Sequence, residues 1–224
     1  MEITTTLINL STITSITLFM CSLCKNWYIL IFLFSAVLIS CSEDQTPETN
    51  HPPIGTAMEG GVLAYVFTAA DAGYIAGEVH GIIVASEDLA TDPQWGCRGA
   101  EVGGTSRTIG SGRANTASVA AFHDNLPAYY TNPRQCHNAN DGTVAAKLAE
   151  DAEINGFSDW FIPTRDEALV LFENRELLGG FSSDDYWSSC ESNRQNACAM
   201  SYVTGATFSA TKDSHKKIRL IRYF

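Results

Sequence analysis

Cysteine is the residue type with the widest range of chemistry in this chain, because a thiol can be acylated, oxidised to a disulfide or used as a metal ligand. The 224-residue sequence contains seven cysteines. Three of them lie in or at the end of an apolar N-terminal region, namely Cys21, Cys24 and Cys41. The other four are spread over the polar remainder, namely Cys97, Cys136, Cys190 and Cys198. The two groups therefore predict different chemistry.

Cys41 directly follows an uncharged apolar run over residues 27–40, which is 14 residues long and is preceded by Lys25. A helix that spans a bilayer needs about 20 apolar residues, so this run has the length of a signal-peptide core rather than of a membrane span. The sequence Leu38-Ile39-Ser40-Cys41 resembles the lipobox of bacterial lipoproteins. That resemblance implies cleavage before Cys41 and acylation of its thiol. A start at Met20 would give a more compact signal than a start at Met1.

The expected organisation is a signal peptide over 1–40, a lipidated disordered tether over 41–58 and one folded domain over 59–224. Residues 42–53 are polar, acidic and proline-bearing, and they offer little apolar surface to offset the entropy of ordering. The lipobox resemblance implies an outer-membrane lipoprotein of the cell envelope, held by its lipid and exposed at the surface. Ser42-Glu43-Asp44 resembles an acidic surface-export signal, with a generic solvated linker as the alternative.

The four remaining cysteines form an even set in a domain expected to be exported, which predicts two disulfides. Three pairings are possible. We favour Cys190–Cys198, which closes a short loop, and Cys97–Cys136, which ties down a long irregular region. A zinc site is the competing hypothesis, but no C-x-x-C spacing is present and the five histidines form no ligand pattern with the cysteines.

The net charge of the chain excludes some classes of binding partner but does not identify one. The chain carries a net charge of −11, with 14 Lys and Arg against 25 Asp and Glu. Nucleic acids are held mainly through neutralised phosphates, so this charge argues against nucleic acid and against polyanionic glycans. No Ser-His-Asp order, H-E-x-x-H or phosphate-binding loop is present, so we expect no enzyme and no cofactor. Calcium stays open, because Asp and Asn cluster around residues 184–196 and 138–141.

The order of the expected elements predicts an α+β class with helices segregated from the sheet. Strands are expected over 60–67 and 79–85, and helices over 116–122, over 143–154 and from Thr164 to about Asn174, the last begun by a capping box. An antiparallel meander of strands should follow over 186–190, 197–203, 206–210 and 217–223, with Thr204-Gly205 as a two-residue turn. Trp160 and Trp187 are expected in the core. Either Arg219 or Arg222 should pair with a carboxylate such as Asp159 or Asp166.

A series of short sequence motifs also occurs in a fixed order along the chain. In chain order they are Gly60-Gly61 with Tyr65, His80-Gly81-Ile82-Ile83-Val84-Ala85, Asp88, Trp95-Gly96, Ile109-Gly110-Ser111-Gly112, Ala114-Asn115-Thr116, Asn155-Gly156-Phe157-Ser158-Asp159-Trp160, Pro163, Glu167, Tyr186-Trp187-Ser188-Ser189, Arg219 and Arg222. Together they resemble the Lcl C-terminal-like domain, a bacterial domain of exported lipoproteins and adhesins. The resemblance implies a C-type lectin-like fold, a twisted antiparallel sheet with two or three flanking helices, whose N- and C-terminal strands pair.

The resemblance carries no catalytic residues, and it implies a surface binding module for a glycan or a protein. The best-studied relative is a trimeric adhesin domain that binds glycosaminoglycans, whereas this chain has no collagen-like stalk and is acidic. Long loops carry recognition in such folds. The expected ligand-facing residues are Tyr129, Tyr130, Asp184, Asp185 and Glu191. The alternative function is an envelope structural protein with one fixed protein partner.

Overall fold

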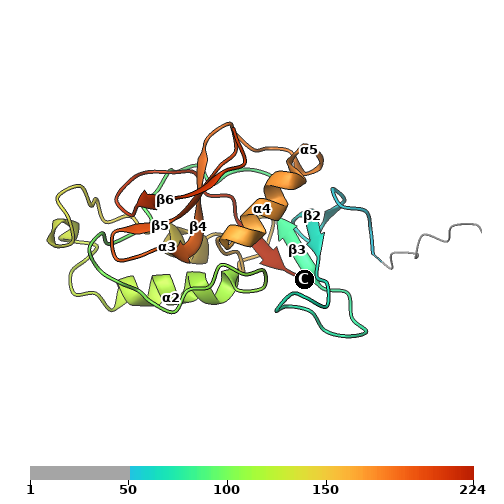
Figure 1. Cartoon of the computed structure of the whole chain (residues 1–224), viewed down its shortest axis with the longest axis horizontal. Coiled ribbons are helices and arrows are strands. Elements are labelled where there is room, and N and C mark those ends of the chain that lie inside the picture. Colours follow the sequence, from blue (N-terminus) through green and yellow to red (C-terminus); the bar gives the residue numbers. More distant parts are fainter. Residues whose placement is uncertain (1–50) are drawn as a thin grey trace, which may run out of the picture. The chain divides into compact units, whose positions relative to one another are not determined.

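The computed structural model describes residues 51–224, so Cys41, the signal peptide and most of the tether lie outside the described residues. The described chain folds as two antiparallel sheets with helices packed against them (Figure 1). In chain order the elements are β1 (Ala57–Met58), β2 (Gly61–Val66), β3 (Gly81–Val84), α2 (Gly112–Asp124), η1 (Pro133–Gln135), α3 (Ala145–Glu150), α4 (Arg165–Glu173), α5 (Arg175–Leu178), β4 (Asp185–Glu191), β5 (Asn196–Ser201), β6 (Thr207–Thr211) and β7 (Ile221–Tyr223). The α+β class is confirmed, with two sheets in place of the single sheet expected. Among residues 51–224, no helix has the length and apolarity that crossing a bilayer requires.

The first sheet has the order β1-β2-β3-β7 and joins the two ends of the domain. All four residues of β3 are buried, which fits the continuous apolar run Gly81-Ile82-Ile83-Val84. β7 lies antiparallel to β3, with Ile83 opposite Arg222. The prediction that residues 217–223 form the last strand of a C-terminal meander was therefore wrong. Only residues 221–223 form a strand. Ile221 is buried against β3 and Phe161, and it does not lie beside β6.

The second sheet is the meander β4-β5-β6. The sequence predicted a two-residue turn at Thr204-Gly205, but residues 202–206 all belong to the connection. It is closed by hydrogen bonds from the Ser201 amide to the Ala206 carbonyl and from the Gly205 amide to the Ser201 carbonyl. The wider connection allows Tyr202 to turn inward, where its side chain is buried.

Three longer helical segments position the loops. α2 begins at Gly112, four residues before the start expected from the sequence, and Asn115 and Thr116 lie inside it as buried side chains. The Asn115 side chain donates to the Ser106 carbonyl, so this amide anchors the loop that precedes α2. α3 is shorter than predicted, ending at Glu150. The capping box that begins α4 is confirmed, with Thr164 and Glu167 bonding each other's backbone amides.

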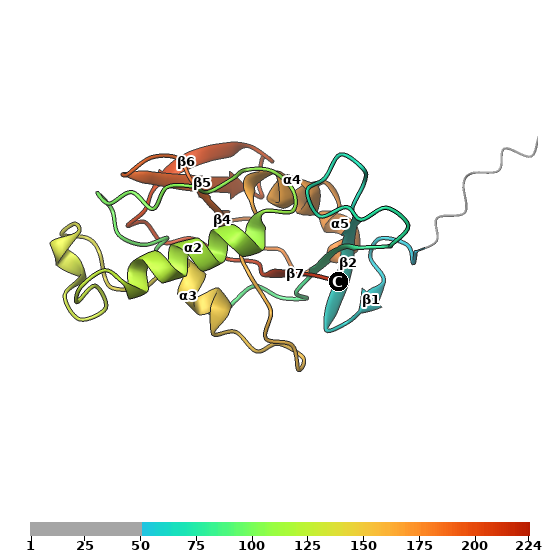
Figure 2. The same cartoon turned by 90° about the horizontal axis from the view of Figure 1, so that it is seen from below.

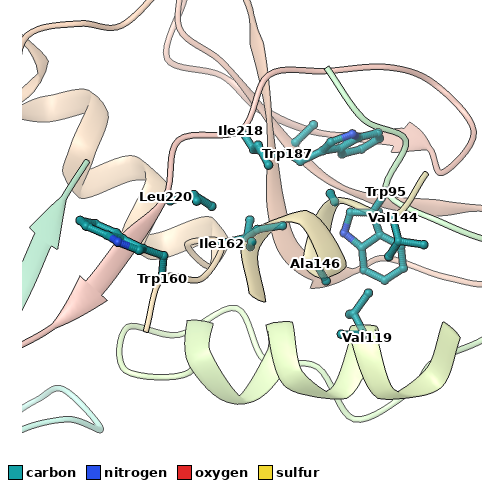
Figure 3. Packing of buried hydrophobic residues seen from close by; sticks show 14 of the residues in the cluster. Trp95, Val119, Val144, Ala146, Trp160, Ile162, Trp187, Ile218 and Leu220 are labelled. Carbon is teal, nitrogen blue, oxygen red and sulfur yellow. The ribbon is translucent and has the colours of Figure 1, made fainter. Parts of the chain in front are cut away.

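Three tryptophans fill the interior, as expected for Trp160 and Trp187. Each indole N–H donates to a backbone carbonyl: Trp95 to Ser188, Trp160 to Phe157 and Trp187 to Pro93. Val119 of α2 and Val144 close the same cluster around Trp95 (Figure 3). A second apolar cluster packs α4 against both sheets, and Figure 2 shows α2 and α4 on separate sides of the second sheet. Large rings bonded in this way fix the position of the loops that they touch.

His123 is buried at the end of α2 and acts as a neutral link between two segments. Its Nδ1 lies 2.7 Å from the Val119 carbonyl oxygen, and its Nε2 accepts the Cys97 amide at 2.9 Å. Nε2 can accept only in the neutral ring, so the Nδ1–H tautomer satisfies both contacts. Burial lowers the pKa of His123 to about 4.

The depressed pKa of His123 predicts a pH-dependent stability. The unfolded chain binds a proton near the ordinary histidine pKa of about 6.5, whereas the folded chain resists it until about pH 4, so stability is lost as the pH falls between these values. We expect protonation of His123 in the unfolded chain to lower the free energy of unfolding by about 2 kcal/mol as the pH falls from 7 to 5. Denaturant titrations of wild type and His123→Gln at both pH values test this, because the variant should lack that part of the slope. Parallel slopes would contradict it.

Candidate functional site

Asp184 and Asp185 border a hollow of about 350 Å³ at the start of β4. Its walls combine carboxylates, two lysines and one exposed apolar side chain, and they comprise Asp92, Ser183, Asp184, Asp185, Val203, His215, Lys216 and Lys217. Val203 is 66% exposed in the connection between β5 and β6. Two of the five residues that the sequence predicted as ligand-facing are therefore in one concave surface.

A second hollow of about 260 Å³ adjoins the first at Ser183, which lines both. Its lining comprises Arg175, Glu176, Gly179, Gly180, Phe181, Ser182, Ser183 and Tyr202. The Phe181 ring stacks on the Tyr202 ring, with centroids 4.7 Å apart. We call the two adjoining hollows the Ser183 surface. Its combined volume suits a ligand larger than a single small group.

The charges on the Ser183 surface are paired at its edge. Lys216 Nζ lies 3.0 Å from Asp185 Oδ2, and Lys217 Nζ lies 2.9 Å from Asp92 Oδ1. The hydrogen bond that Lys217 donates to Asp92 raises the pKa of Lys217. Within residues 51–224, the Asp184 carboxylate has no ion-pair partner. The ammonium groups can donate hydrogen bonds to the hydroxyl or amide groups of a ligand, and the carboxylates can accept hydrogen bonds from them. Because most of these charges are paired, the surface has no strong preference for a charged ligand.

Buried contacts under the surface hold its loop in place. Arg219 is 1% exposed and donates from Nε to Asp88 Oδ1 at 2.7 Å and from Nη1 and Nη2 to the carbonyls of Ala85 and Gly180. Asp88 also accepts the Tyr186 hydroxyl at 2.6 Å, and that hydroxyl accepts the Ser182 amide. Burial, followed by the Asp88 bond, raises the pKa of Tyr186 to about 12. A loop fixed by such a network loses little entropy when a ligand binds.

Arg222 pairs with Asp159, as the sequence predicted for one of the two arginines. Arg222 donates from Nε to Asp159 Oδ1 at 2.7 Å, and it also pairs with Glu59. Hydrogen bonds from Arg222 outweigh partial burial and lower the pKa of Asp159. The predicted Asp159 pairing is confirmed, whereas the Arg219 partner Asp88 lies 131 positions away in the sequence and gave no local signal.

Two of the expected ligand-facing residues are structural instead. Tyr129 is 0% exposed, and its hydroxyl accepts the Asn140 side-chain amide at 3.2 Å. The Glu191 side chain is 5% exposed, forms an ion pair with the buried Lys212 and accepts the amides of Val102 and Gly103. The prediction that Tyr129 and Glu191 face a ligand was therefore wrong. Glu191 holds the segment after Trp95 to β4, and Tyr129 packs in the core beside His123.

Tyr130 remains on the surface but belongs to neither hollow. It is 45% exposed, and its hydroxyl donates to Asp124 Oδ1 at 2.7 Å. Burial and the Asp124 bond raise the pKa of the Tyr130 hydroxyl. The structure does not bring Tyr130 together with Asp184 and Asp185, so the predicted ligand set divides into separate places.

Substitution at the tyrosine pair should separate the two roles. Tyr129→Ala removes a buried ring and leaves a cavity, so we expect a loss of about 3 kcal/mol in the free energy of unfolding. Tyr130→Ala removes an exposed ring and should cost less than about 1 kcal/mol. Denaturant unfolding of the two variants measures the difference. Equal losses in both variants would show that the burial of Tyr129 is misassigned.

The two disulfides are Cys97–Cys136 and Cys190–Cys198, each with its Cα atoms 5.4 Å apart. These are the pairs that the sequence favoured. The first joins the segment after Trp95 to the segment at η1, and the second joins β4 to β5. Within the described residues, no three His, Cys, Asp or Glu side chains are grouped to hold a metal ion. Asn140 of the 138–141 cluster instead donates to Gln94, Gly96 and Tyr129.

Comparison with known proteins gives a distant likeness to a solved structure. No family model and no curated protein matches the chain. Among solved structures, a fimbrial protein from Bacteroides ovatus ATCC 8483 is similar over 72% of this chain, with 15% sequence identity and a TM-score of 0.44. The aligned region spans 43% of the length of that protein.

Proposed function

We propose that this chain is a surface-anchored lipoprotein whose folded domain binds a glycan without catalysing a reaction. The observation that carries the proposal is Leu38-Ile39-Ser40-Cys41, followed by an acidic tether and then by a compact domain. Lipid on Cys41 would hold the domain at the outer membrane, and the tether would place it beyond the lipid surface. The two disulfides support an oxidising compartment, where such bonds persist.

We further propose that the domain is C-type lectin-like and related to the Lcl C-terminal-like domain. The pairing of β3 with β7 supports this, because it brings the N- and C-terminal strands together as that resemblance implies. The loops over 86–111 and 127–144 are long and irregular, and the disulfide from Cys97 to Cys136 joins them. Loops on a rigid scaffold are the usual place for recognition.

The Ser183 surface is the ligand site in this proposal. Asp184, Asp185 and Lys216 supply acceptors and donors for hydroxyl groups, and Val203 supplies an exposed apolar contact beside them. Because the charges at its edge are paired and the chain is acidic, a neutral hydroxyl-rich ligand fits better than a polyanion.

Crosslinking in living cells, followed by mass spectrometry, separates this proposal from a structural role with one fixed partner. A binding module should give crosslinks that depend on which ligand is present, each at a low fraction of the total protein. One dominant partner crosslinked in near-equal amount, whatever glycan is supplied, would favour the envelope structural protein and contradict the proposal.

A further inference from the structure

The second sheet ends in an open edge at β6. β6 pairs with β5 on one side, and within residues 51–224 no other strand pairs with it. Figure 2 shows β6 at the outer edge of the domain, beyond β5. Its sequence Thr207-Phe208-Ser209-Ala210-Thr211 contains no charged residue and no proline, and its first three residues are exposed. Edge strands are commonly protected by charges, prolines or a covering segment, and β6 has no charge or proline.

The register of β6 shows which of its backbone groups point away from β5. The Ser201 amide bonds the Ala206 carbonyl and the Lys212 amide bonds the Gln195 carbonyl, so the even-numbered residues between them face β5. Hydrogen bonding alternates along an antiparallel strand. The N–H and C=O of Thr207 and Ser209 therefore point outward at the open edge.

A basic pocket adjoins the same two residues. It has a volume of about 180 Å³ and is lined by Arg107, Arg165, Ser192, Cys198, Thr207, Phe208 and Ser209. Ser209 lies opposite Cys198 in the ladder, so their side chains share one face of the sheet, and Ser209 Oγ donates to Ser192 Oγ at 2.8 Å. The pocket therefore lies on the face to which a strand paired with β6 would direct every second side chain.

The donors in this pocket suit a carboxylate. Arg165 uses Nε and Nη2 to contact one oxygen of Asp166, which leaves its other guanidinium N–H groups available. The Arg107 guanidinium makes no ion pair within residues 51–224. Two arginines with three hydroxyl side chains form a positive pocket in a chain of net charge −11, and a carboxylate is the group that guanidinium binds in a fixed, two-pronged geometry.

We propose that β6 is a docking edge for an extended acidic segment of another protein, which adds an antiparallel strand beside it. The segment's backbone would bond the outward N–H and C=O of Thr207 and Ser209, and one Asp or Glu side chain would enter the pocket between Arg107 and Arg165. Strand addition of this kind takes affinity from the backbone bonds and specificity from alternate side chains. The inference is independent of the Ser183 surface, since the two share no lining residue.

The test uses the full-length protein, purified in detergent and labelled for NMR, with a capped five-residue peptide, Thr-Val-Glu-Val-Thr. At millimolar concentration the peptide should slow amide exchange at Ser209 by about tenfold or more, because that N–H becomes bonded. A peptide with Gln in place of Glu should bind about tenfold more weakly, because charge-assisted bonds to arginine are lost.

Two variants separate backbone pairing from charge. Ser209→Pro removes the outward N–H but no bond to β5, so it should keep the melting temperature and abolish binding of the Glu peptide. Arg107→Gln with Arg165→Gln should abolish the preference for Glu over Gln, and Arg134→Gln, an exposed arginine outside the pocket, should leave it unchanged.

Three results would overturn the proposal. The first is an unchanged exchange rate at Ser209 with the Glu peptide, and the second is undiminished binding in folded Ser209→Pro. The third is a dimer of the protein in solution that Ser209→Pro converts to monomer, because β6 would then pair with a second copy of this chain.

Discussion

Replacing Lys212 by alanine should lower the free energy of unfolding by about 3–5 kcal/mol, because it leaves a buried carboxylate without its partner. The Lys212 side chain is fully buried, pairs with Glu191, donates to the Ala100 carbonyl and lies 4.8 Å from the centroid of the Trp95 ring. Burial lowers the pKa of Lys212, while Glu191 opposes that shift. The pair connects the hairpin of β5 and β6 to the segment after Trp95.

Two comparisons make the Lys212 prediction specific. Lys217→Ala removes an exposed ion pair with Asp92 and should leave the free energy of unfolding almost unchanged. Replacing Lys212 by Met and Glu191 by Leu together should recover a substantial part of the loss, because no unpaired charge stays buried. Denaturant unfolding of the four proteins measures these differences. A Lys212→Ala variant no less stable than Lys217→Ala would refute the buried pair.

Cys41→Ala should release the protein from the membrane fraction or lead to accumulation of uncleaved precursor. The thiol of Cys41 is the proposed site of acylation, and each CH₂ of a buried acyl chain contributes about 0.8 kcal/mol of membrane affinity. Removal of the thiol removes the whole anchor, so the expected change is nearly complete. Fractionation of cells and gel mobility of the protein measure it.

A matched control for the anchor is Cys24→Ala, which lies within the expected signal peptide and should leave membrane association unchanged. Metabolic labelling with palmitate gives the decisive comparison, because label should enter the wild type and Cys24→Ala but not Cys41→Ala. Incorporation of label into Cys41→Ala would refute lipidation at that residue.

Features that depend on neighbouring residues could be predicted from the sequence. The Thr164 and Glu167 capping box is set by a three-residue spacing, and it begins α4 as expected. Burial of Trp160 and Trp187 follows from the size of their rings, and the two favoured cysteine pairs are those in the structure. In each case the signal is local or rests on a small set of residues.

Features that depend on distant partners could not be predicted. Glu191 was interpreted as a surface acid because nothing nearby in the sequence indicates that Lys212 will be buried beside it. Tyr129 stands next to the exposed Tyr130, and only Asn140 and the surrounding core distinguish them. The part played by Lys216, Lys217 and Asp92 in the Ser183 surface was missed for the same reason, since three separate segments form it.

The central claim is that the Ser183 surface binds a glycan, and a printed array of glycans and proteins tests it most directly. Full-length wild type should be retained on a defined set of neutral glycans, and Asp184→Asn with Asp185→Asn should lose that retention while keeping the wild-type melting temperature. Asp151→Asn, a substitution of the same kind at an exposed carboxylate outside both hollows, should behave as wild type. Retention by no glycan, or equal retention of wild type and the Asp184 and Asp185 variant, would contradict the claim.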